Sequence, residues 1–97
     1  MMTHNSKKMK TTYEGIIRDI KYLLTLSSEK EVIDKSKEIL DMIYKALGEG
    51  TKESPQAKSL AKMAVILIKI INSEDNVERE FFMGQLSSLI SWGVENE

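Results

Sequence analysis

Residues 60–71 are the most apolar stretch of the chain, and they limit its fold more than any other feature. Apart from Lys62 and Lys69, every residue in this stretch is Ala, Val, Leu, Ile or Met. As a helix that rises about 1.5 Å per residue, the stretch spans about 18 Å, which is too short for a hydrocarbon core of about 30 Å. We therefore predict a buried helix at the centre of a small core, and not a membrane span.

Chain length and composition narrow the class of protein. A chain of 97 residues makes one domain, and without cysteine it has neither disulfides nor thiolate metal sites, so its stability must come from packing. Residues 1–10 are basic but lead into charged residues instead of an apolar signal core. The net charge is −1, and the sequence shows no sustained basic face of the kind that nucleic-acid binding needs. We expect a flexible N-terminal arm over residues 1–10 and a cytoplasmic protein that does not bind nucleic acid.

Apolar residues recur with the helical period in four segments. Thr11 with Glu14, and Ser28 with Glu31, have the spacing of capping boxes at the first two helix starts. Pro55 follows Ser54, which is typical of a third helix start. Glycines end the second segment, and Gly93 is expected to end the fourth. The pattern predicts helices over about 12–26, 29–47, 55–72 and 76–92.

These helices define an expected architecture. Connections of a few residues favour neighbours that run in opposite directions. The fold class that we predict is all-α: an antiparallel up-down four-helix bundle in a single domain over 11–97, preceded by the disordered basic arm over 1–10. The third helix is expected to supply the largest share of the core.

Residues that carry out catalysis are scarce. The one histidine, His4, lies in the expected arm, and the serines stand at helix caps or on a helix face with no base beside them. The acidic loop 72–76 lacks the spaced ligands and closing glutamate of an EF-hand. We therefore expect no enzyme activity, no cofactor and no metal site.

Two groups of residues are candidates for contact with a partner. At 100° per residue, Lys58, Lys62 and Lys69 fall on one narrow line of the third helix, here called the lysine strip. Phe81 and Trp92 lie together on one flank of the fourth helix. Trp92 has two interpretations: its ring closes the open end of the bundle, or it joins Phe81 and residues 94–97 in a contact edge.

Three segments of the chain resemble a known family. They are Tyr13–Ile20, which opens the first helix, the glycine-containing turn after the second, and Leu86–Gly93, which closes the fourth. In size, helix order and these segments, residues 11–93 resemble the immunity proteins of class IIa (pediocin-like) bacteriocin producers, notably the enterocin A immunity type.

The resemblance implies a function and a set of contact residues. Such proteins protect a bacterium from its own membrane-active peptide by acting, from the cytosol, on the complex between the bacteriocin and the mannose phosphotransferase permease. Their C-terminal half decides which bacteriocin is countered. Carried onto this chain, the resemblance points to the lysine strip, as a contact with an acidic partner or an anionic membrane surface, and to four residues of the C-terminal half: Phe81, Gln85, Trp92 and Val94.

Two other classes of protein fit the same residues. One is a small helical regulator or adaptor, of the kind that phages and plasmids encode, which binds a host protein. The other is a bundle that self-associates as a weak dimer, so that the wide apolar face of the third helix is covered by a second copy. The sequence does not choose between a monomer and a dimer.

Overall fold

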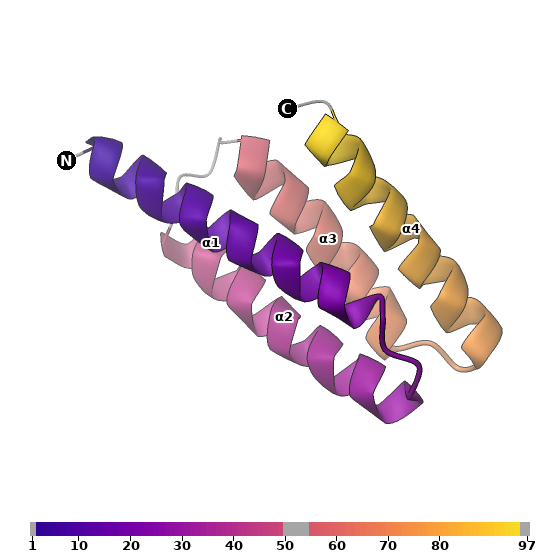
Figure 1. Cartoon of the computed structure of the whole chain (residues 1–97). Coiled ribbons are helices and arrows are strands. Elements are labelled where there is room, and N and C mark those ends of the chain that lie inside the picture. The colour runs from indigo at the N-terminus through magenta and orange to yellow at the C-terminus, as the bar shows by residue number, and fades with distance from the viewer. Residues whose placement is uncertain (1, 50–54, 96–97) are drawn as a thin grey trace.

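The structure is a computed structural model that describes residues 2–49 and 55–95, with side chains over 12–48 and 55–91. The described residues form four helices and no strand: α1 (Met2–Leu23), α2 (Glu29–Glu49), α3 (Pro55–Ile71) and α4 (Asn76–Glu95) (Figure 1). Consecutive helices run in opposite directions. The predicted all-α, antiparallel four-helix bundle is confirmed.

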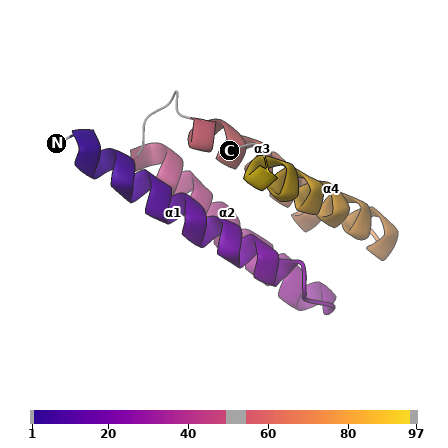
Figure 2. The same cartoon turned by 45° about the horizontal axis from the view of Figure 1, so that its top comes forward.

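The helices associate as two hairpins, α1 with α2 and α3 with α4 (Figure 2). Helix α3 lies against both α2 and α4 and also contacts α1, whereas α4 packs mainly on α3. The bundle is therefore less closed around α4 than around α3. None of the four described helices is both long enough and apolar enough to cross a membrane.

The core is a continuous cluster of aliphatic side chains along the inner faces of the helices. Each helix contributes residues at the spacing that the sequence predicts, and α3 contributes more fully buried large side chains than any other helix. The apolar side chains that are less than 2% exposed are Ile16, Ile20, Leu23, Ile39, Ile43, Leu60, Met63, Leu67, Ile70 and Leu86.

The apolar run of α3 is not wholly buried. Val65 is 53% exposed and Ile68 is 38% exposed, whereas Leu67 between them is fully buried. Both exposed positions fall on the arc of α3 that α1, α2 and α4 leave uncovered. The expectation that residues 60–71 are buried throughout is wrong at these two positions.

Three helices begin where local chemistry favours a start. Helix α2 begins directly after Ser28, whose carbonyl oxygen accepts a hydrogen bond from the Val32 amide at 2.9 Å. Helix α3 begins at Pro55, as predicted. Asp75 caps α4, because its Oδ1 accepts a hydrogen bond from the Glu78 amide at 2.8 Å.

The ends of α1 and α4 differ from the prediction. Helix α1 begins at Met2, so residues 2–10, expected as a flexible arm, are helical, and Thr11 lies inside the helix instead of capping it. Residues 2–12 contain neither glycine nor proline, and lysine and methionine are good helix formers. Helix α1 also ends at Leu23, three residues before the predicted end at 26. Just after this end, the Thr25 hydroxyl donates a hydrogen bond to the Tyr22 carbonyl oxygen at 2.6 Å.

Helix α4 continues past Gly93 to Glu95, so Gly93 does not end it. A glycine costs a helix about 1 kcal/mol, and it stops the helix only when a left-handed residue is needed there. Helix α2 likewise includes Gly48 and reaches Glu49.

A buried arginine ties α4 to α2. The guanidinium of Arg79 donates a hydrogen bond to Asn76 Oδ1, and its Nη1 lies 3.6 Å from a carboxylate oxygen of Glu29 at the start of α2. The Arg79 side chain is almost fully buried, although no pattern in the sequence predicts an arginine in the core. Its contacts join the two hairpins at the end of the bundle where α2 and α4 begin.

Candidate functional site

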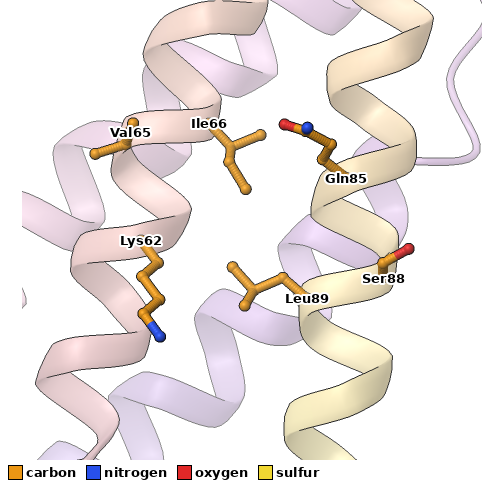
Figure 3. Close-up of a pocket in the computed structure, with 6 residues that line it drawn as sticks. All are labelled: Lys62, Val65, Ile66, Gln85, Ser88 and Leu89. Carbon is orange, nitrogen blue, oxygen red and sulfur yellow. The ribbon is translucent and has the colours of Figure 1, made fainter.

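An open groove runs between α3 and α4 on the outer surface of the bundle (Figure 3). It has a volume of about 610 Å³, and six of the residues with described side chains line it. We call it the α3–α4 groove. Its lining comes from Lys62, Val65 and Ile66 of α3 and from Gln85, Ser88 and Leu89 of α4.

The antiparallel packing of the two helices explains why these residues meet. On each helix the lining positions are three and four residues apart, so they share one face. The side chains of Ile66 and Leu89 point toward each other across the groove, and the Gln85 amide reaches toward α3 (Figure 3). Ser88 points away from α3 at the outer edge. The floor of the groove is therefore aliphatic, and its polar groups lie at the rim.

The lysine strip follows the α3 side of the groove. Lys58, Lys62 and Lys69 are all exposed, and none of them forms an ion pair with a carboxylate of the described residues. The ammonium group of Lys69 lies 5.6 Å from the centroid of the Phe82 ring, which is a cation–π distance. The described part of the bundle therefore presents a row of uncompensated positive charge beside an apolar trough.

Phe81 is the largest exposed apolar side chain among those that the structure describes on α4. It is 61% exposed, and its ring makes an edge contact with Phe82, with the centroids 5.4 Å apart. It stands one helical turn before Gln85, so it continues the outer edge of the groove. A phenylalanine that is mostly in water contributes little to the core and is available for contact with another molecule.

The structure places two of the seven residues that the sequence singled out in one groove. Lys62 and Gln85 line the same groove, although they are far apart in the sequence. Lys58 lies one turn from Lys62, and Lys69 reaches α4 through Phe82. Trp92 and Val94 belong to the last part of α4, but their side chains lie outside the described ones, so both interpretations of Trp92 stay predictions.

Four lining residues were missed by the sequence reasoning: Val65, Ile66, Ser88 and Leu89. A signal for Val65 was present, because at 100° per residue it falls beside the lysine strip and not with the buried residues. Ile66 and Leu89 are half-buried, and no sequence pattern separates a half-buried aliphatic residue from a core one.

The groove offers noncovalent contacts. Aliphatic carbons, ammonium groups and one side-chain amide suit the binding of another molecule and contain no pair of groups arranged for proton transfer. Within the described residues, no cluster of three His, Asp or Glu side chains is placed to hold a metal ion. A surface for a binding partner is therefore the chemical role that this site supports.

No protein-family model, no curated protein and no solved structure matches the chain. The likeness to class IIa immunity proteins therefore stays a prediction.

Proposed function

We propose that this chain is a binding protein of the bacteriocin-immunity type, and that it protects its cell from a membrane-active peptide by contacting the complex of bacteriocin and permease. The observation that carries the proposal is the α3–α4 groove. It joins an exposed apolar surface to lysines that pair with no carboxylate of the described residues, and it lies in the C-terminal half of the chain, which the resemblance makes responsible for specificity.

The arrangement of the helices supports this role. Helix α4 packs mainly on α3, so the α3–α4 hairpin leaves one long side open to another protein. The remaining half of the bundle packs behind α3 and gives the groove a rigid base of fully buried side chains such as Leu67 and Ile70. A preformed surface on rigid helices binds at a lower entropic cost than a flexible loop does.

Expression of the chain in a bacteriocin-sensitive strain tests the proposal. The minimal inhibitory concentration is measured for a panel of class IIa bacteriocins, and also for a pore-forming peptide that does not use the mannose phosphotransferase permease. We expect the chain to raise the inhibitory concentration of at least one class IIa member and to leave that of the unrelated peptide unchanged. No change for any class IIa member, with the folded protein present in the cells, would refute the immunity function.

A further inference from the structure

We infer that the α3–α4 groove takes an acidic amphipathic helix of about three turns from a partner protein. The inference rests on the proposed function only in taking the α3–α4 groove as the binding surface. It adds the chemistry of the segment that is bound. Helices that lie in grooves are a common mode of protein recognition, in which one apolar face supplies affinity and flanking charges supply specificity.

The lysine strip beside the groove has the length of a short helix. Ile66 and Leu89 form a half-buried floor between two helices, and Val65 extends it outward with half of its side chain in water. The strip spans twelve residues of α3, from Lys58 to Lys69, which is a rise of about 16 Å at 1.5 Å per residue. A bound helix of about three turns has the same length and presents apolar residues at every third or fourth position.

The charge of the groove selects an acidic partner. Lys58 and Lys62 have no acidic partner within the described residues, so carboxylates on a bound helix gain attraction without breaking an existing ion pair. A basic helix on the same floor would meet like charges along its whole length. The strip therefore acts as a selectivity element as well as a source of affinity.

Acidic residues near the start of α4 argue against a lipid surface as the occupant of the groove. Among the described side chains of α4, Phe81 and Val77 are the most exposed large apolar ones, and the neighbouring Glu78 and Glu80 repel anionic headgroups. The groove is shallow and open, and the side chains of a bound helix reach its half-buried floor residues, Ile66 and Leu89. An acidic partner helix matches both this aliphatic floor and the lysines.

Direct binding to designed peptides tests the inference without a bacteriocin. Two fluorescent helical peptides share one leucine face and differ only in their flanks, which are glutamate in one and lysine in the other. We expect the full chain to bind the glutamate peptide, to bind it more weakly as salt is raised, and to bind the lysine peptide at least tenfold more weakly. Equal or tighter binding of the lysine peptide, or no binding of the glutamate peptide, would overturn the inference.

Matched variants locate the binding. Lys62→Glu in the groove should weaken binding of the glutamate peptide about three- to tenfold, whereas Lys37→Glu on the exposed face of α2 makes the same change in net charge and should have little effect. Val65→Asn should also weaken binding, whereas Val77→Asn, at a more exposed position outside the lining, should not. Equal effects of the two variants in either pair would place the peptide elsewhere and overturn the inference.

Two further measurements identify other occupants. Cosedimentation with phosphatidylglycerol vesicles that Lys62→Glu abolishes, in the absence of peptide binding, would assign the surface to a membrane. Sedimentation as a dimer that Val65→Asn converts to a monomer would assign it to a second copy of the chain. Either result overturns the inference. Failure of peptide binding with protection intact refutes only the acidic helix, whereas peptide binding without protection refutes only the immunity function.

Discussion

Two substitutions in α3, two residues apart, test how that helix is packed. Leu67 is fully buried, so Leu67→Ala removes three carbons from the core. At about 0.8 kcal/mol for each carbon, the lost transfer free energy is about 2.4 kcal/mol, and the cavity left behind raises the total to about 3–4 kcal/mol. That is a large share of the free energy of unfolding of a domain of this size, which is about 5–15 kcal/mol.

Val65→Ala should behave very differently. Val65 is 53% exposed, so the loss of two methyl groups costs about 0.7 kcal/mol. Alanine is the better helix former by about 0.5 kcal/mol, which offsets most of this cost. The net change in the free energy of unfolding should lie within about 0.5 kcal/mol of zero.

Urea denaturation followed by circular dichroism at 222 nm measures both changes. The account predicts a difference of about 3 kcal/mol between the two variants, with equal denaturant slopes. If Val65→Ala destabilised the chain as much as Leu67→Ala, α3 would be enclosed on its outer side and the groove would not be open. If Leu67→Ala left the melt unchanged, α3 would not be the centre of the core.

Three other changes test single features of the fold. Ser36→Ala should raise the free energy of unfolding by about 1 kcal/mol, because the Ser36 hydroxyl is fully buried and has no hydrogen-bond partner among the described residues; a loss of stability would show that the hydroxyl is paired. Asp75→Ala should cost about 1 kcal/mol through loss of the α4 cap, and Asp75→Asn should restore most of it in the same urea titration. Arg79→Ala should cost about 2 kcal/mol because its buried stem and hydrogen bond are lost, whereas Glu29→Gln, at the exposed end of the ion pair, should cost under about 1 kcal/mol; equal costs would contradict the burial of the arginine.

Local signals predicted the number, order and direction of the helices. Pro55 and Ser28 mark helix starts through backbone chemistry that does not depend on the rest of the fold, and the spacing of apolar residues identified the inner face of α2. The exposure of Tyr22 also follows from its position on the helical wheel, and the structure has it 56% exposed.

The errors arose where tertiary packing decides the outcome. The two helix ends are exceptions: residues 2–10 are good helix formers without glycine or proline, so α1 continues through them, and Gly93 does not stop α4. The burial of Arg79 depends on Glu29, which comes from another hairpin. Val65 is apolar, and only the position of α4 on one side of α3 leaves it in water.

The candidate site, too, was predictable from the sequence only in part. The lysine strip and Phe81 were recognisable from the sequence because a wheel separates them from the core residues of their own helices. The sequence did not show that Lys62 and Gln85 face one groove, because this depends on how α3 and α4 are aligned along each other. The sequence thus indicated the two edges of the site, and the packing of the hairpin brought them together.

Protection of a sensitive strain by a matched pair of variants tests the central claim, that the α3–α4 groove is the functional surface. Lys62→Glu and Lys37→Glu change the net charge equally, and both lysines are exposed, so both variants should fold and accumulate like the parent chain. The account predicts that Lys37→Glu keeps the inhibitory concentration of the class IIa bacteriocin high, whereas Lys62→Glu lowers it toward that of the unprotected strain. Equal protection by both variants would contradict the claim.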